Sequence, residues 1–423
     1  MAGTAENGSC VLRIWPILFL CVGFTCAAPP QRQDALFDQA FDALSQETYY
    51  SFIRYDLNQL EYSGPGFRKI FPAIRESGHR KVQILHLGDS HVHADSFTGV
   101  VREKFQRLFG RAGHGLVFPY AAAKTHSTRF YVSQAFGSWR YNQSVFPPNG
   151  LPIGLSGAVI QTSVPGSSVS VAFYDKPPLE SPVIKLFCAG DPASFRAAIK
   201  TNTGESITQR CAEMVGDSAS FNFTRDFQSF SMQTVQDSRT QNYFRLFGFS
   251  LERASAGIIY HSAGINGARF SDLAHRQEVA PQMIRSMQPD LVVLDMGINE
   301  VYTFRDAPET FEADVRTSIS LLRQNSPALP ILIMNLPEIY VKSINLNLSD
   351  SYTSLLRKIA RETNCAFYDT YAISGGRGSM YRWAINGLAG EDFNHLTWKG
   401  YEVKADLFVQ AFLKSYLIET NSN

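Results

Sequence analysis

A serine follows a short apolar run near residue 90, in a setting where it could act as a nucleophile. Residues 82–87 (VQILHL) lead directly into Gly88, Asp89, Ser90 and His91. A serine at the turn between a buried strand and a helix projects its hydroxyl above the sheet edge, and its backbone N–H can help to stabilise an oxyanion. An isolated Gly-Asp-Ser is more often an ordinary helix cap, so the motif needs partners elsewhere in the chain.

An aspartate and a histidine near the C-terminus could supply those partners. Asp392 lies three residues before His395. At this spacing one turn of chain can bring the carboxylate to the imidazole, fix the tautomer and leave the other ring nitrogen facing a serine as general base. We therefore expect Ser90, Asp392 and His395 to form a catalytic triad. Taken alone, an aspartate three residues before a histidine is common and mostly structural.

Two further residues predict donors for an oxyanion hole. Gly267 lies within residues 264–268 (GINGA), and Asn299 lies shortly after another apolar run. The backbone N–H of Gly267 and the side-chain amide of Asn299 would join the N–H of Ser90, and removal of one such donor typically costs about 3–4 kcal/mol of transition-state stabilisation. Each residue could instead be a turn glycine or a capping asparagine.

These candidate residues depend on a parallel sheet to bring them together. Short, nearly continuous apolar runs are typical of strands buried on both faces, and here they alternate with segments of helical spacing such as 311–324 and 351–363. This alternation predicts a doubly wound, three-layer α/β/α fold with its site at the carboxyl ends of the strands. The expected strands are 82–87, 258–260, 291–296, 331–334 and 366–368.

Residues 116–250 interrupt the alternation. Stretches such as 168–174 (SVSVAFY) and 221–232 (FNFTRDFQSFSM) alternate polar with apolar residues, and prolines punctuate the region. We expect an inserted antiparallel β domain between the first and second strands of the parallel sheet. The alternative is a set of long loops without a core of their own.

The N-terminal residues have the character of an export signal. Residues 11–26 form an apolar run that is short for a bilayer span, which needs about 20 residues, and Ala27 and Ala28 follow it. We expect residues 1–28 to be a signal peptide and the mature protein to be periplasmic or secreted, with an uncleaved anchor as the alternative. No later segment is long and apolar enough to span a membrane.

Cysteine usage agrees with an oxidising destination. Three of the six cysteines lie in the expected leader, which leaves Cys188, Cys211 and Cys365. Cys188 and Cys211 fall in the same β-rich stretch and could form a disulfide, while Cys365 would remain as a buried small hydrophobic residue. No Cys-x-x-Cys pair is present to hold a metal.

Composition excludes some classes of partner. The 423 residues include 39 Lys plus Arg against 38 Asp plus Glu, a net charge of +1. This balance offers no basic excess for nucleic acid and no polybasic patch for an anionic membrane. The hydrophobic fraction of 44% is enough for a large core and excludes a mainly disordered chain.

Together, and in this order, these blocks resemble the SGNH (GDSL-type) hydrolase family. The resemblance places Ser90, Asp392 and His395 in the triad and Ser90, Gly267 and Asn299 in the oxyanion hole. It implies an α/β/α fold and ester hydrolysis through an acyl-serine intermediate. It implies neither a cofactor nor a metal.

Two positions depart from the usual family pattern, and one of them sharpens the resemblance. His91 stands where the motif usually has Leu, and Glu300 stands where the third block often has Asp. Together with residues 94–99 (ADSFTG) and 109–115 (FGRAGHG), the histidine at position 91 makes the sequence resemble bacterial periplasmic peptidoglycan O-acetylesterases. Those enzymes also carry a carbohydrate-binding-like β module inserted after the first block.

The predicted organisation and function follow. The chain is expected to be a serine esterase that removes O-acetyl groups from a cell-wall glycan, with peptidoglycan as the favoured substrate and acetyl-serine as the intermediate. The expected domains are the signal peptide 1–28, an N-terminal helical arm 29–80, a hydrolase domain formed by 81–115 and 251–423, and the inserted β domain 116–250.

Other functions are compatible with some of the same candidate residues. The same triad could transfer an acyl group to a sugar hydroxyl, act on another acetylated polysaccharide or lipid, or belong to an inactive wall-binding protein. A metal-dependent hydrolase would instead use the histidines and aspartates of the first block with carboxylates from other strand ends. Those candidate ligands are His86, His91, His93, Asp95, Asp295 and Asp369. The sequence does not predict the oligomeric state.

Overall fold

The structure is a computed structural model that describes residues 49–175, 182–211, 218–302, 308–335, 337–342 and 344–421. The expected signal peptide and the first part of the expected arm, residues 29–48, lie outside the described residues. Within the described part of the chain, no helix combines the length and apolar character that a bilayer crossing requires.

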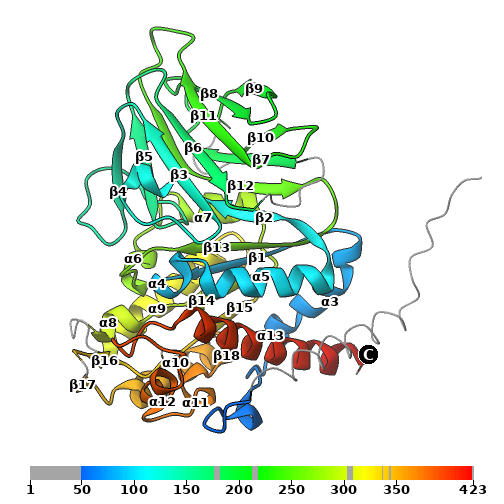
Figure 1. Ribbon diagram of the computed structural model, residues 1–423, viewed down its shortest axis with the longest axis vertical. Coiled ribbons are helices and arrows are strands. Elements are labelled where there is room, and N and C mark those ends of the chain that lie inside the picture. The colour runs from blue at the N-terminus through cyan, green and yellow to red at the C-terminus, as the bar shows by residue number, and fades with distance from the viewer. Residues whose placement is uncertain are drawn as a thin grey trace, which may run out of the picture.

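A central sheet contains the parallel strands that the apolar runs predict (Figure 1). Its parallel part has the order β2-β13-β1-β14-β15-β18, and β1 pairs in parallel with both β13 and β14. The sheet is mixed, with helices packed on it, which confirms the expected fold class. These strands are β1 (Lys81–Gly88), β2 (Arg111–Val117), β13 (Gly257–Gly264), β14 (Leu291–Asp295), β15 (Ile331–Met334) and β18 (Ala366–Tyr368).

Helices cover both faces of the parallel strands. In β1, Val82 and Ile84 pack into the core on one face, while Leu85 and Leu87 pack into the core on the other. Successive side chains of a strand point to opposite faces, so a strand covered on both sides needs a continuous apolar run. One face carries α3 (Ile70–Arg75), α5 (Ser96–Phe109) and α13 (Trp398–Asn421), and the other carries α6 (Phe270–Ala274), α7 (Ala280–Met287), α9 (Pro308–Arg323) and α10 (Ser349–Glu362).

Strands from the insert contribute to two sheets. Beyond β2 the central sheet continues in antiparallel fashion through β12, β7 and β10, and β5 with β4 branches from β12. These strands are β4 (Arg140–Gln143), β5 (Ala158–Thr162), β7 (Pro182–Cys188), β10 (Ser218–Asn222) and β12 (Phe244–Arg253). The second sheet has the order β3-β6-β11-β8-β9, with β3 (Tyr131–Phe136), β6 (Ser168–Phe173), β8 (Arg196–Thr201), β9 (Ser206–Gln209) and β11 (Ser229–Val235).

The two sheets enclose a hydrophobic core, which argues against a set of loops without a core. Phe230 of β11 and Phe249 of β12 meet edge to face across this core, with ring centroids 5.1 Å apart. The insert is nevertheless continuous with the central sheet, because residues 116 and 250, the expected boundaries, lie within β2 and β12. The sequence did not predict β12, whose pairing with β2 and β7 joins the two parts.

The alternating residues 221–232 contribute to two strands. The structure divides them between β10 and β11. The Glu205 carboxylate accepts hydrogen bonds from the backbone N–H groups of Thr224 and Arg225 at 3.2 and 3.1 Å. Those groups are therefore unavailable to a strand ladder, and the chain turns between the two strands.

The described part of the expected arm consists of short helical elements. They include α2 (Pro65–Arg68), which begins at Pro65 and comes before α3. Glu61 exchanges two backbone hydrogen bonds with Phe367 and so covers the exposed edge of β18. The remaining short elements are α11 (Thr370–Ile373), α12 (Ser379–Ile385), β16 (Tyr340–Val341) and β17 (Ile344–Asn345).

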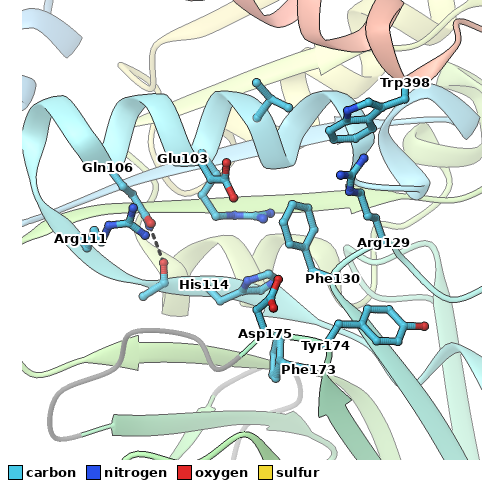
Figure 2. Close-up of a pocket in the computed structure, with 13 residues that line it drawn as sticks. Glu103, Gln106, Arg111, His114, Arg129, Phe130, Phe173, Tyr174, Asp175 and Trp398 are labelled. Atoms are coloured by element: carbon cyan, nitrogen blue, oxygen red, sulfur yellow. Dashed lines mark hydrogen bonds between the residues drawn. The ribbon is translucent and has the colours of Figure 1, made fainter.

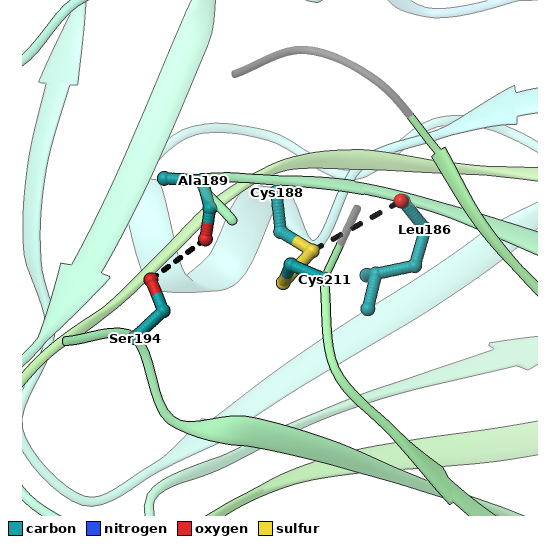
Figure 3. The surroundings of a disulfide bond; sticks show 5 residues. All are labelled: Leu186, Cys188, Ala189, Ser194 and Cys211. Atoms are coloured by element: carbon teal, nitrogen blue, oxygen red, sulfur yellow. Dashed lines mark hydrogen bonds between the residues drawn. A yellow bond between two sulfur atoms is a disulfide. The ribbon is translucent and has the colours of Figure 1, made fainter. Parts of the chain in front are cut away.

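A disulfide joins Cys188 to Cys211 within the buried core of the insert (Figure 3). Cys188 ends β7, and nearby the Ser194 hydroxyl donates a 2.7 Å hydrogen bond to the carbonyl of Ala189. Cys365 is free and buried. The structure thus pairs the two cysteines that the sequence placed in one β-rich stretch, and such a bond is typical of an oxidising compartment.

We expect the double variant Cys188→Ala/Cys211→Ala to lower the free energy of unfolding by about 3 kcal/mol. The cystine closes a loop with a sequence separation of 23 residues, and this size of effect follows from the chain entropy that a cross-link removes from the unfolded state. Urea unfolding of the oxidised protein and the variant measures it. If the two proteins unfold at the same urea concentration, the disulfide does not stabilise the insert.

Candidate active site

The three residues of the predicted triad meet at the carboxyl end of β1. Ser90 is the first residue of α4 (Ser90–His93), which follows β1 directly. Its Oγ lies 2.9 Å from Nε2 of His395, and Nδ1 of His395 lies 2.6 Å from Oδ2 of Asp392. Residues more than 300 positions apart in sequence therefore form one hydrogen-bonded chain from hydroxyl to imidazole to carboxylate.

Local hydrogen bonds hold Asp392 in an ionised state. Burial alone would raise the pKa of its carboxyl group, but the side chain of His395 and the backbone N–H groups of Asn394 and His395 outweigh burial and lower it. The two N–H groups donate to Oδ1, each at 3.0 Å. The second oxygen is thus free to orient the imidazole and to stabilise it when it becomes charged.

The triad lies at the surface. The side chains of His395 and Asp392 are 53% and 49% exposed. A serine that is reached from open solvent can act on an acyl group attached to a bulky polymer, because the rest of the polymer need not enter a deep pocket.

His91, noted in the sequence only as a departure and a possible metal ligand, packs against the imidazole of His395. Its ring stacks on that of His395 with centroids 5.3 Å apart, and its Nδ1 lies 3.0 Å from the hydroxyl of Tyr401. Burial, with the nearby Lys404 charge, lowers the pKa of His91 to about 3. His91 therefore stays neutral and can support His395 without opposing its protonation.

The oxyanion candidates converge on the same strand ends. Gly267 has φ +83°, a left-handed conformation that favours glycine, and neither its N–H nor that of Ser90 has an acceptor among the described residues. Asn299 lies in α8 (Ile298–Tyr302), and its Nδ2 donates to the carbonyl of Ala268 at 3.0 Å. A longer contact of 3.4 Å links the same Nδ2 to Oδ2 of Asp89. The three sequence blocks are therefore joined through Asn299.

Glu300, the second departure from the family pattern, has a structural explanation. Its buried carboxylate accepts a 2.5 Å hydrogen bond from the N–H of Phe270, the first residue of α6. This bond ties α8 to the helix that follows the Gly267 turn. It connects the elements that carry the two oxyanion candidates.

We expect Asn299→Ala to lower kcat for ester hydrolysis by about 10²–10³, because an oxyanion loses one preorganised donor. Steady-state kinetics on a small activated acetate ester measures the change. The matched control is Asn386→Ala, since Asn386 is an exposed asparagine at the end of α12. A variant of Asn299 that keeps more than half of the wild-type kcat would contradict the assignment.

Asp89, between β1 and Ser90, is buried next to a second carboxylate. Its Oδ1 accepts the N–H of His91 at 3.0 Å and caps α4. Burial and then the charge of Asp295 raise the pKa of Asp89 to about 7. Lys404 donates to Asp295 at 2.8 Å and, against the effect of burial, holds the pKa of Asp295 well below its usual range.

This arrangement predicts a pH-dependent stability. The folded protein favours the protonated form of Asp89. The stability that this preference contributes is fully present below the pKa of Asp89 in the unfolded chain, and it is lost as the pH rises through the folded-state pKa of about 7. The free energy of unfolding of the wild type, relative to Asp89→Asn, should therefore fall between pH 4 and pH 8 by up to about 4 kcal/mol. Urea unfolding of both proteins across this range tests it, and a constant difference would contradict it.

The candidate metal ligands do not point to a common centre. His86 Nδ1 lies 2.7 Å from the hydroxyl of Tyr260, and His93 Nε2 lies 2.8 Å from the carbonyl of His126. Asp95 pairs with Arg102. Asp369 caps α11, far along the sheet from the first block. Each of these side chains has a structural role within the described part of the chain.

The fold and this hydrogen-bonded chain define a serine hydrolase of the α/β/α type. A sequence profile of the GDSL-like lipase/acylhydrolase family matches residues 204–403, just under half of the chain. The matched range contains Gly267, Asn299, Asp392 and His395, whereas Ser90 lies before it. The match over residues 204–403 identifies an SGNH (GDSL-type) hydrolase domain, whose class is that of the carboxylic ester hydrolases.

A solved structure described as a peptidoglycan O-acetylesterase in action shares this fold, with a TM-score of 0.65 at 21% identity over 84% of this chain and 98% of its own. An acetyl-xylooligosaccharide esterase from Geobacillus Stearmophilus is 24% identical over 37% of this chain and 73% of its own, with a TM-score of 0.29. A family two carbohydrate esterase from Clostridium thermocellum, in complex with cellohexaose, is 12% identical over 67% of this chain and 100% of its own, also at 0.29. A search of curated protein sequences found no match.

Proposed function

We propose that this protein is an exported serine acetylesterase that removes O-acetyl groups from a cell-wall glycan, with peptidoglycan as the favoured substrate. The observation that carries the proposal is the chain of hydrogen bonds from Ser90 through His395 to Asp392 at an exposed strand end. The fold shared along most of the chain with a peptidoglycan O-acetylesterase supports the choice of polymer.

The mechanism assigns one role to each group. His395 accepts the proton of Ser90 as the serine oxygen attacks the acetyl carbonyl, and Asp392 stabilises the imidazolium that forms. The N–H groups of Ser90 and Gly267 and the amide of Asn299 hold the oxyanion. His395 then protonates the departing sugar oxygen, which leaves acetyl-serine. Water, deprotonated by His395, attacks this ester, and His395 returns the proton to the Ser90 oxygen as the acyl–serine bond breaks and acetate is released.

Export is supported by the disulfide between Cys188 and Cys211, since such bonds persist in oxidising compartments. We propose that residues 1–28 direct export and are removed, and that 81–115 with 251–423 build the hydrolase around the insert at 116–250. N-terminal sequencing of protein recovered from the periplasm or medium tests the leader. A mature chain that begins at Met1 would show that the leader is retained.

Side-by-side measurement of acetate release tests the substrate. The purified protein is incubated with O-acetylated peptidoglycan, acetylated xylan and a long-chain ester, and free acetate or fatty acid is measured. We expect the highest kcat/KM on O-acetylated peptidoglycan. Faster hydrolysis of acetylated xylan or of the long-chain ester would show that the protein acts on another class of substrate. Acyl transfer without release of free acid would show that the protein is an acyltransferase.

A further inference from the structure

We propose that a cavity between the hydrolase part and the insert binds uncharged sugar units adjacent to the acetylated one. The inference rests on the proposed function and names the site that would position the glycan over Ser90. The cavity has a volume of about 250 Å³ and lies between α5, β2 and the ends of the insert's β3 and β6 (Figure 2). The residues that line this cavity lie near the triad but have no role in the proposed chemistry.

Two structural links connect this cavity to the triad. Trp398, which lines it, follows His395 by three residues, so the two Cα atoms are within about 11 Å of each other. On the other side, the N–H of Arg129 donates a 3.0 Å hydrogen bond to the carbonyl of Ala94, the residue that follows α4. A glycan whose acetyl group reaches Ser90 therefore has this cavity beside it.

Aromatic side chains give the cavity surfaces on which a sugar ring can stack. Tyr174, directly after β6, is 60% exposed, and the Arg102 guanidinium lies over the ring of Phe130, 5.6 Å from its centroid. The guanidinium of Arg129 lies over the ring of Trp398. Figure 2 shows Phe130, Tyr174 and Trp398 around one space, with Arg129 between them. Apolar faces with polar edges are suited to a ligand that is partly apolar and rich in hydroxyls.

The charged residues of the lining balance one another. Arg102 is neutralised within the protein by Asp95, at 2.8 Å. Beyond it, the lining contains the carboxylates of Glu103 and Asp175 and the guanidinium groups of Arg111 and Arg129. Two charges of each sign give donors and acceptors without a net field. This combination favours hydroxyl and acetamido groups over a fatty acyl chain, which needs an apolar lining.

His114 adds a neutral donor and acceptor inside this lining. Its ring packs edge to face against Phe130, Tyr131 and Phe173, and neither nitrogen has a hydrogen-bond partner among the described residues. Burial, with the positive charge of Arg102, holds the pKa of His114 well below its usual range. A neutral imidazole can hydrogen-bond an uncharged sugar without attracting an anion.

Point variants test this site better than removal of the insert. Deletion of residues 116–250 would remove β7 and most of β12 from the central sheet, so loss of activity would not identify a binding site. Tyr174→Ala removes an exposed stacking surface, and Glu103→Gln removes one charge while it keeps the side-chain volume. Phe136→Ala is the matched control, because Phe136 is 76% exposed on β3 and does not line the cavity.

The measurement is the ratio of kcat/KM on the acetylated polymer that the wild type hydrolyses fastest to kcat/KM on 4-nitrophenyl acetate. We expect this ratio to fall about tenfold in Tyr174→Ala and Glu103→Gln and to stay at the wild-type value in Phe136→Ala. Calorimetric titration of Ser90→Ala with soluble O-acetylated peptidoglycan fragments should show binding that the added Tyr174→Ala change weakens about tenfold.

The possible results distinguish failure of the proposed function from failure of the proposed sugar site. A wild type that hydrolyses 4-nitrophenyl acetate but no acetylated glycan would overturn the proposed function. If the wild type hydrolyses the polymer and both cavity variants keep a kcat/KM ratio within twofold of the wild-type ratio, the sugar site is overturned while the proposed function stands. Circular dichroism and thermal unfolding of each variant establish that the comparison is made between folded proteins.

Discussion

Ser90→Ala should abolish ester hydrolysis while the protein remains folded. The hydroxyl that lies 2.9 Å from His395 is the only reacting group that the change removes, and loss of a triad member typically costs about 10⁴–10⁶ in rate. The free energy of unfolding should change by no more than about 1 kcal/mol, because one partly exposed hydrogen bond is lost. Turnover of 4-nitrophenyl acetate by the purified variant measures the first effect, and urea unfolding the second.

Two controls make this result specific. Ser96→Ala changes a serine that begins α5, the next helix after α4, and should keep wild-type turnover. Treatment of the wild type with a chelator should leave activity unchanged. Residual activity of more than a few per cent in Ser90→Ala would exclude it as the nucleophile, and a chelator-induced loss that zinc restores would support the metal-dependent alternative.

Asp392→Asn should lower kcat by up to about 10⁴ with little effect on folding. The carboxylate accepts the Nδ1–H of His395 at 2.6 Å, and an amide in its place can hold the imidazole in the wrong tautomer. Hydrogen bonds lower the pKa of Asp392, so the wild-type carboxylate should stay ionised throughout the working pH range. The rate difference between wild type and variant should therefore persist from weakly acid to alkaline pH.

A neighbouring carboxylate provides the control for this variant. Glu391 is exposed and precedes Asp392, so Glu391→Gln makes the same chemical change one residue away. We expect this control to retain the wild-type pH profile and kcat. If Asp392→Asn keeps nearly the full rate, or if both variants lose the same fraction of it, the aspartate does not orient the histidine.

Local sequence patterns were sufficient to predict five of the six parallel strands, and β2 is the one that they did not predict. The five continuous apolar runs became parallel strands because a strand covered by helices on both faces must be apolar at every position. The serine turn after residues 82–87 and the close spacing of Asp392 and His395 are local as well. The sequence could therefore place Ser90, Gly267, Asn299, Asp392 and His395 at strand ends and in a late loop, where the structure brings them together.

Other features depend on contacts between distant segments and have no local signal. Residues 221–232 alternate throughout, but they are divided between two strands, and the carboxylate of Glu205 binds two backbone N–H groups where the chain turns. β12 joins the insert to the central sheet through pairings with β2 and β7. The stacking of His91 on His395 joins residues that are about three hundred positions apart.

The sequence by itself determined the class of fold, the candidate triad residues and their order along the chain. Only the tertiary structure decided that the insert shares its sheet with the hydrolase, that His91 supports the triad, and that Trp398, Arg129 and Tyr174 surround one cavity. The physical reason is that periodicity and turn chemistry act between neighbours in the chain. Strand pairing, ring stacking and the lining of a cavity depend instead on which distant surfaces pack against each other. No spacing pattern within a single sequence predicts those contacts.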